Sequence, residues 1–344
     1  MRFPYHAVVA LPLLALACSS AQGVSSSEAD QTAALTAPKR AWAEHPAIVE
    51  TDDADDIYAV SDAHGHYELL AQLLEANHLM KAGAGGDPTK ATWTGGHAVL
   101  VVAGDLIDKG DKSLEVIDLL RALQASAPAR RVIVTMGNHE AEFLDDPANK
   151  KASNSGQDSD GIDNELKVSK VDPQSLVKGT DAAGRGKWIS TLPLGARVKK
   201  WFFSHAGNTQ QLSIKDLNTK LQNSIDNNGY SGAQTTCSND PKAKTCDSIL
   251  ESQNWYSNPD KDDSGKKEAD ALGVNHIVFG HDPGGLGVNG KIAASKNGIL
   301  VKIDTAMGIH DSNGVGKAFL LHVSTKGKDS AEILDASGGS KGLL

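Results

Sequence analysis

Short apolar runs recur along the chain, and each is hydrophobic almost throughout rather than at every second position. A continuous run of this kind is typical of a strand that is buried on both faces. Two segments between the early runs instead carry apolar residues at helical spacing, at 67–79 and 112–123. Strands that alternate with helices predict an α/β fold. The predicted strands are residues 57–61, 98–103, 131–135, 200–204, 276–279 and 299–303.

The first 18 residues have the pattern of a secretory signal peptide. Arg2 precedes an apolar run at 7–17 that is too short to span a bilayer, and small residues follow it. The segment ending in Cys18 also resembles a bacterial lipobox, which predicts that Cys18 carries a lipid and anchors the chain in the cell envelope, periplasmic or at the outer membrane. The alternative is an ordinary signal peptide cleaved near Ala21, in which case Cys18 is lost with it.

The rest of the chain is predicted to contain one tether and one domain. Residues 19–50 are rich in Ser, Ala and Thr and have little periodicity, which indicates a flexible tether. Residues 51–344 are predicted to form a single domain with polar surface insertions near 145–186 and 222–267. Cys237 and Cys246 lie in the second insertion, and we expect them to form a disulfide in an oxidising compartment. The alternative, a metal site, lacks a second cysteine pair.

Composition and charge limit the classes of molecule that the protein is expected to bind. The formal net charge is −9 and no long block of Lys or Arg is present, so nucleic-acid binding through phosphate neutralisation has little support. The 40% share of hydrophobic residues is typical of a globular chain. We therefore expect a monomer that acts on a small molecule or a locally modified protein, with membrane contact only through the lipid anchor.

Unusual polar residues directly follow five of the predicted strands. Strand ends are where α/β folds place their functional sites, so these side chains should meet at one edge. Imidazole and carboxylate ligands without thiolate suit ions such as Mn, Fe and Zn. Six candidate ligands are enough for two metal ions that activate water and neutralise charge during phosphoryl transfer. The candidates are Asp62, His64, Asp105, Asn138, His205 and His281.

The motifs around these residues resemble those of the calcineurin-like metallophosphoesterases, in the branch of the phosphoprotein phosphatases and the Shewanella-like bacterial phosphatases. They occur in the family's order: Asp-x-His-Gly, Gly-Asp-x-x-Asp-x-Gly, Gly-Asn-His-Glu, Ser-His-Ala-Gly and Gly-His, from residue 62 to residue 281. The resemblance implies a four-layer α/β/β/α sandwich. It also implies a binuclear metal-dependent phosphatase that hydrolyses phosphate monoesters of a phosphoprotein or a small phosphoester.

Residue roles follow from the same resemblance. Asp62 and His64 are expected to bind the first metal, Asp105 to bridge the two, and Asn138, His205 and His281 to complete the second. A metal-bridging hydroxide would attack phosphorus, and His139 would protonate the leaving oxygen with Asp108 holding its imidazole. Lys109, Asn138 and His66 are the predicted substrate contacts. Glu140 is expected to support these residues from behind.

One departure and two alternatives remain at this point. Lys109 stands where the phosphatase branch usually has an arginine fork, so directional binding of two phosphate oxygens is weakened. Related enzymes with the same ligands are dinucleoside polyphosphate hydrolases or phosphodiesterases, which is the first alternative. The second is a non-catalytic envelope binding protein that retains the fold.

Overall fold

All six predicted strands are present in a computed structural model, which describes residues 39–148, 161–234, 248–253, 255–256, 263–308 and 317–344. Their ends differ from the predicted ones by a residue at most. The strands are β2 (Asp56–Val60), β5 (Val99–Ala103), β6 (Val132–Thr135), β8 (Trp201–Ser204), β9 (His276–Phe279) and β11 (Leu300–Lys302).

The strands are divided between two six-stranded sheets. The first sheet has the order β1-β7-β8-β9-β11-β10, and β8, β9 and β11 are mutually parallel within it. The second has the order β14-β13-β12-β2-β5-β6, with β2, β5 and β6 parallel. The carboxyl ends of each parallel set therefore meet at one edge. The additional strands are β1 (Ile48–Thr51), β7 (Gly195–Val198), β10 (Ala293–Ala294), β12 (Phe319–Ser324), β13 (Ser330–Asp335), β14 (Ser340–Gly342), and the separate pair β3 (Met80–Lys81) and β4 (Thr92–Trp93).

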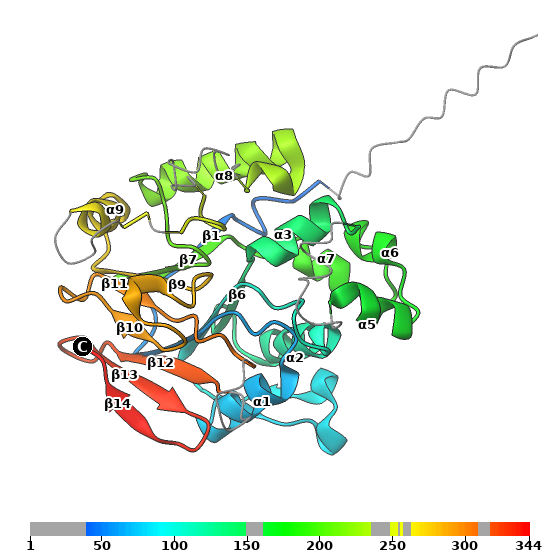
Figure 1. Ribbon diagram of the computed structural model, residues 1–344, viewed down its shortest axis with the longest axis horizontal. Helices are drawn as coiled ribbons and strands as arrows, with labels where there is room; N and C mark the ends of the chain where they lie inside the picture. Colours follow the sequence, from blue (N-terminus) through cyan, green and yellow to red (C-terminus); the bar gives the residue numbers. More distant parts are fainter. Residues whose placement is uncertain (1–38, 149–160, 235–247, 254, 257–262, 309–316) are drawn as a thin grey trace, which may run out of the picture. The chain divides into compact units, whose positions relative to one another are not determined.

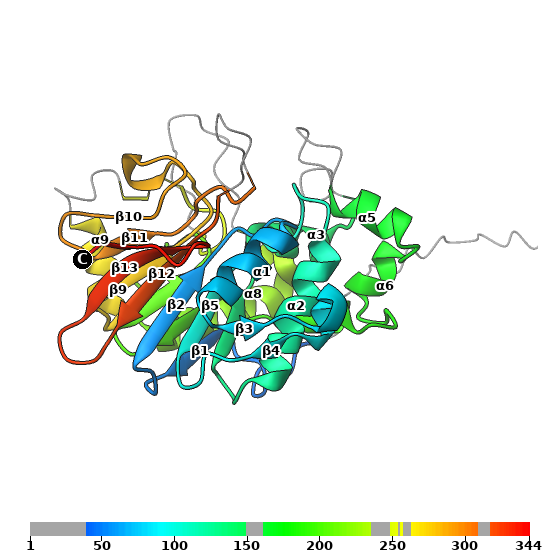
Figure 2. The ribbon, with the colours of Figure 1, turned by 90° about the horizontal axis from the view of Figure 1, so that it is seen from below.

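Helices cover the outer face of each sheet (Figures 1 and 2). Alternate residues of the strands explain this layering. Ile57 and Ala59 belong to the apolar cluster shared by the two sheets, whereas Val60 belongs to the cluster that includes the helices. α1 (Tyr67–Ala76) buries Leu70, Leu73 and Leu74 against this second cluster. The arrangement is the predicted α/β/β/α sandwich, and the described residues belong to one compact unit.

The sequence pattern predicted two of the helices, at 67–79 and 112–123. α2 (Ser113–Ser126) corresponds to the predicted helix at 112–123, and α1 ends three residues before its predicted end. Among the described residues, no helix is both long and apolar enough to cross a bilayer. The other helices are α3 (Asn138–Asp145), α5 (Ile162–Val168), α6 (Pro173–Val177), α7 (Arg185–Ile189), α8 (Ile214–Asn228), α9 (Ser264–Leu272), and the 3₁₀ turns η1 (Ala84–Gly86), η2 (Pro88–Lys90), η3 (Gly229–Gly232) and η4 (Gly285–Gly287).

The predicted tether at 19–50 extends too far toward the domain. Residues 48–51 form β1, which pairs in parallel with β7. The Arg40 guanidinium is buried and donates hydrogen bonds to the carbonyl oxygens of His45, Pro46 and Leu192. Sequence pattern missed this strand because its pairing partner lies about 150 residues later in the chain. The folded region therefore includes residues from about 39 onward.

The polar stretch at 145–186 is also more than a surface insertion. Its described part forms α5, α6 and α7, which bury apolar side chains in the helix-side cluster, Ile162, Leu166, Leu176 and Val177 among them. The predicted lipidation of Cys18 and the predicted disulfide between Cys237 and Cys246 fall outside the described residues.

Candidate metal centre

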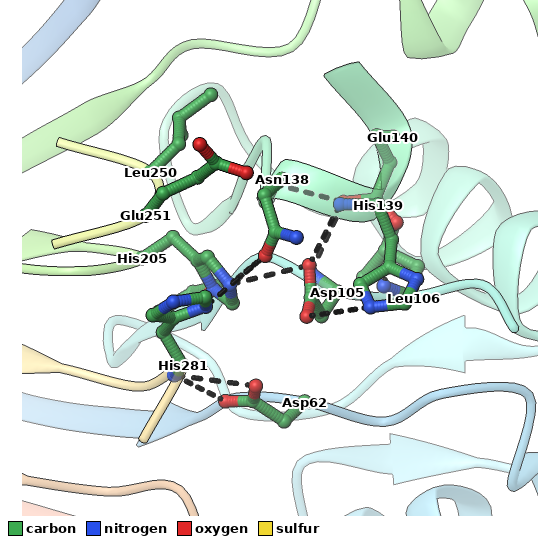
Figure 3. Close-up of polar contacts among 12 residues, drawn as sticks. Asp62, Asp105, Leu106, Asn138, His139, Glu140, His205, Leu250, Glu251 and His281 are labelled. Carbon is green, nitrogen blue, oxygen red and sulfur yellow. Dashed lines mark hydrogen bonds and ion pairs between the residues drawn. The ribbon is translucent and has the colours of Figure 1, made fainter. Parts of the chain in front are cut away.

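The candidate ligands do converge at the edge where the parallel strands of both sheets end. Asp62 and His64 follow β2, Asp105 follows β5, and Asn138 begins α3 directly after β6. His205 and His281 follow β8 and β9 of the other sheet. Figure 3 shows that the side chains of Asp105, Asn138, His205 and His281 point toward one another. Two sheets thus contribute to one buried polar cluster.

The backbone of this edge adopts conformations that ordinary residues avoid. Asp62, His64, Asp105 and His281 all have positive φ, at 55°, 42°, 53° and 64°. Each non-glycine residue in this region costs on the order of 1 kcal/mol. Such strain persists where the surrounding structure fixes it, and it is concentrated at functional sites. The sharp turns are what direct consecutive side chains back toward the strand ends.

One group of ligand atoms lies around His64, Asp105 and His139, all within 4.8 Å of one another. Nδ1 of His64 is 2.8 Å from the carbonyl oxygen of Ile107, which fixes the proton on Nδ1 and leaves the Nε2 lone pair toward the cluster. That Nε2 atom is 3.4 Å from Oδ2 of Asp105 and 3.9 Å from Oδ1 of Asp62. This geometry suits a cation held by Asp62, His64 and Asp105, with His139 beside it.

A second group is formed by Asp105, His205 and His281. Nδ1 of His205 donates to the carbonyl oxygen of Ala103, so its Nε2 faces Oδ1 of Asp105 at 3.2 Å. Oδ1 of Asn138 is 3.0 Å from His205 Nε2 and 3.1 Å from His281 Nδ1. Asp105 therefore presents one carboxylate oxygen to each group, as a bridging ligand would.

The buried carboxyl groups of the cluster also favour bound cations. Asp62, Asp105 and Asp304 are each at most 3% exposed. Burial, followed by the nearby Asp304 charge, raises the pKa of Asp62 well above its ordinary value, and burial likewise raises the pKa of Asp304. Burial and the neighbouring His205 lower the pKa of His281 to about 3, so this imidazole is neutral. Buried carboxylates beside a neutral imidazole fit two metal ions.

His139 and Asp108 form a buried pair next to the ligands. Nδ1 of His139 is 2.7 Å from Oδ2 of Asp108, and both side chains are at most 8% exposed. Burial opposes the charge of His139, but Asp105 and Asp108 together raise the pKa of its imidazole above the ordinary value. Nε2 of His139 faces Asp105 Oδ2 at 3.8 Å. The neighbouring carboxylates thus favour the protonated imidazole, and its Nε2 atom is directed at the cluster.

Glu140 supports the cluster in a way that the sequence only hinted at. Its carboxylate is fully buried and accepts hydrogen bonds from the backbone N–H groups of Asp105, Leu106, Ile107 and Gly137, at 2.7–3.2 Å. Burial, and then the Asp105 charge, raise the pKa of Glu140. One side chain of α3 therefore fixes the turn that carries Asp105.

The predicted substrate contacts are placed as follows. Nζ of Lys109 is 2.7 Å from His64 Nε2, the same lone pair that a metal would use. A metal on His64 would therefore compete with the Lys109 ammonium for this atom. The ring of His66 packs against Gly308, where a Cβ atom would lie 2.0 Å from His66 Nε2. Asn138 lies inside the cluster rather than at its rim.

Fold and cluster together define a metallohydrolase sandwich whose site lies at the strand ends. The model of the calcineurin-like phosphoesterases matches residues 56–285, and the chain belongs to this family. The structure is similar to the cold-active protein-tyrosine phosphatase of a psychrophilic Shewanella species, with a TM-score of 0.62 and 19% identity over 87% of this chain and 82% of that one. A protein serine/threonine phosphatase from Saccharomyces cerevisiae gives a TM-score of 0.53 and 17% identity over 82% of this chain and 78% of that one.

Two of the curated relatives are named for different activities. A symmetrical bis(5'-nucleosyl)-tetraphosphatase of Mannheimia succiniciproducens is 29% identical over 48% of this chain and 51% of its own length. Shewanella-like protein phosphatase 1 of Plasmodium berghei is 29% identical over 50% of this chain and 45% of its own length. The chain thus spans about half the length of these two relatives.

Proposed function

We propose that the protein is a metal-dependent phosphatase that hydrolyses phosphate monoesters of a phosphoprotein or a small phosphoester. The observation that carries this proposal is the position of Asp105, whose two carboxylate oxygens face separate groups of imidazole ligands. Two metal ions bound there would lower the pKa of a water molecule and neutralise charge on a transferring phosphoryl group. Mn, Fe and Zn all accept these ligands.

The chain's own residues would then orient the phosphate and supply a proton. Lys109, whose Nζ lies 2.7 Å from His64 Nε2, would hold phosphate oxygens by its charge, without the directional fork of an arginine. His139 would transfer the proton on Nε2 to the ester oxygen as the phosphorus–oxygen bond breaks. Asp108, bonded to Nδ1, holds the imidazole in the tautomer that this transfer requires.

Activity and metal content test the proposal together. The purified protein should hydrolyse p-nitrophenyl phosphate, lose this activity with a chelator and regain it with Mn, Fe or Zn. Asp105→Asn should lower kcat by at least about 100-fold and reduce the bound metal. Asp270→Asn makes the same change on an exposed helix position and should leave both unchanged. A wild-type protein that binds two metals but hydrolyses no phosphate ester would support the non-catalytic alternative.

Hydrolysis of dinucleoside polyphosphates is the second candidate, because several curated relatives are named bis(5'-nucleosyl)-tetraphosphatases. Comparison of kcat/KM for a phosphoserine peptide, phosphotyrosine, a phosphodiester and diadenosine tetraphosphate separates the two candidates. The monoesterase proposal requires that a monoester has the highest value. A clear preference for diadenosine tetraphosphate would replace it.

A further inference from the structure

We propose that α5 is a positioning element for the acid pair, in which the backbone N–H of Ile162 orients Asp108 and thereby His139. The inference rests on the proposed phosphatase function and goes beyond it, because it assigns a role to a segment outside the motifs. Ile162 touches neither metal ligands nor substrate in this scheme. It acts only through the carboxylate of Asp108.

Both carboxylate oxygens of Asp108 have a defined partner. Oδ2 is 2.7 Å from His139 Nδ1, and Oδ1 accepts a hydrogen bond of 3.1 Å from the Ile162 N–H. The Asp108 side chain is 0% exposed, so water cannot easily replace either bond. A carboxylate held at both oxygens cannot rotate about its own axis. Its orientation sets the plane and tautomer of the His139 ring.

Glu165, one turn further along α5, fixes the helix to the protein. Its carboxylate accepts hydrogen bonds of 2.7 Å from the backbone N–H groups of both Ser113 and Leu114, at the start of α2. Free N–H groups at a helix start are strong donors to a carboxylate. Ile162 and Leu166 are fully buried beside these contacts. α5 is therefore held from two sides with its first N–H directed at Asp108.

α2 ties this contact back to the motif loop. Oγ of Ser113 accepts a hydrogen bond of 3.3 Å from the backbone N–H of Asp108. The same Ser113 donates its own N–H to Glu165. A continuous network of hydrogen bonds thus links α5, the start of α2 and the acid pair. Displacement of α5 would be transmitted to His139 through Asp108.

Two substitutions at Ile162 isolate the N–H. Proline has no N–H, and it is tolerated at the first position of a helix. Gly161 has φ −70° and ψ 161°, which is a backbone conformation that permits a following proline. Ile162→Ala also removes most of the buried side chain but keeps the N–H. The difference between Ile162→Pro and Ile162→Ala therefore reports the hydrogen bond to Asp108.

Leaving-group dependence separates acid positioning from a general structural defect. Phenyl phosphate has a basic leaving group that needs protonation, whereas p-nitrophenyl phosphate needs it far less. Ile162→Pro should lower kcat for phenyl phosphate about tenfold relative to Ile162→Ala, and kcat for p-nitrophenyl phosphate by about twofold or less. Bound metal per chain should be equal in both variants. Glu165→Ala should show the same pattern, and exposed Asp163→Ala on the same helix should match the wild type.

The outcomes are distinct from those of the function test. If the wild type hydrolyses neither ester, the proposed function is refuted, and this inference is refuted with it. If the wild type is active but Ile162→Pro and Ile162→Ala have the same ratio of the two kcat values, the inference is overturned. Should Ile162→Pro not fold, the comparison of Glu165→Ala with Asp163→Ala decides, and equal ratios there overturn it.

Discussion

Replacement of Glu140 by glutamine should destabilise the protein, because its carboxylate accepts several buried backbone hydrogen bonds. The Glu140 carboxylate serves four backbone N–H groups from two separate segments. In Glu140→Gln one oxygen becomes an NH₂ group, which faces donors instead of accepting from them. Two of the four hydrogen bonds are then lost in a fully buried place.

The size of the effect follows from these contacts. Hydrogen bonds to a charged group contribute about 1.5–3 kcal/mol each, so two lost bonds cost about 3–6 kcal/mol. Removal of a buried charge offsets part of this, since burial raises the pKa of Glu140 and so disfavours its ionised form. We expect a net loss of about 2–4 kcal/mol in the free energy of unfolding.

Urea-induced unfolding of wild type and Glu140→Gln, with and without metal, measures this loss. Glu75→Gln is the matched control, because Glu75 is exposed on α1 and should change the free energy of unfolding by less than about 0.5 kcal/mol. Metal affinity should also fall by about 10–100-fold, as for other groups that orient a ligand. A loss below about 1 kcal/mol in Glu140→Gln would show that the four N–H groups find other acceptors, and would refute the reasoning.

Three further predictions concern the same region. Asp105 and Asp108 raise the pKa of His139 against its burial, so Asp108→Asn should shift the alkaline fall of kcat/KM to lower pH; an unshifted pH profile would contradict this. Burial lowers the pKa of Lys302 to about 8, so between about pH 8 and 10 the unfolded wild type binds more protons than the folded protein. The free energy of unfolding should therefore rise with pH over this range in the wild type but not in Lys302→Met. Parallel unfolding curves of the two proteins would count against it. Gly104→Ala should bind less metal and should lose at least about 2 kcal/mol of unfolding free energy, because the new Cβ would lie 2.6 Å from Gly137 Cα at a φ of 81°. A variant that melts at the wild-type temperature would contradict this packing argument.

Predictability of the fold differed between its centre and its edges. β5 reads Val-Leu-Val-Val-Ala and is buried throughout, so its apolar run is sufficient to identify it. β13 has only one buried residue, and β14 is fully exposed, so neither has an apolar run. β7 contains Gly195 and Arg197, which interrupt its apolar run, and it is defined by its pairing with β1 and β8. β7, β13 and β14 lack a continuous buried apolar run, so the local pattern does not predict them.

The site shows a similar division. Asp105 and His205 could be placed because each directly follows a buried strand, and strand order determines which ends meet. The contact of Ile162 with Asp108 could not be anticipated, because a backbone N–H has no side-chain signature. Lys302 was also missed, since its ammonium lies in an apolar run and donates to the carbonyl oxygens of Pro283 and Val288.

The left-handed backbone at the strand ends has a consequence for the protein under selection for heat resistance alone. Glycine adopts this conformation freely, so replacement of Asp62, His64 or His281 by glycine should relieve about 1 kcal/mol each. A library screened only for survival of the fold should therefore accumulate glycine at the positions where the metals are expected to bind. Catalytic competence and thermal tolerance compete here at single residues, and only a screen that demands turnover would retain both.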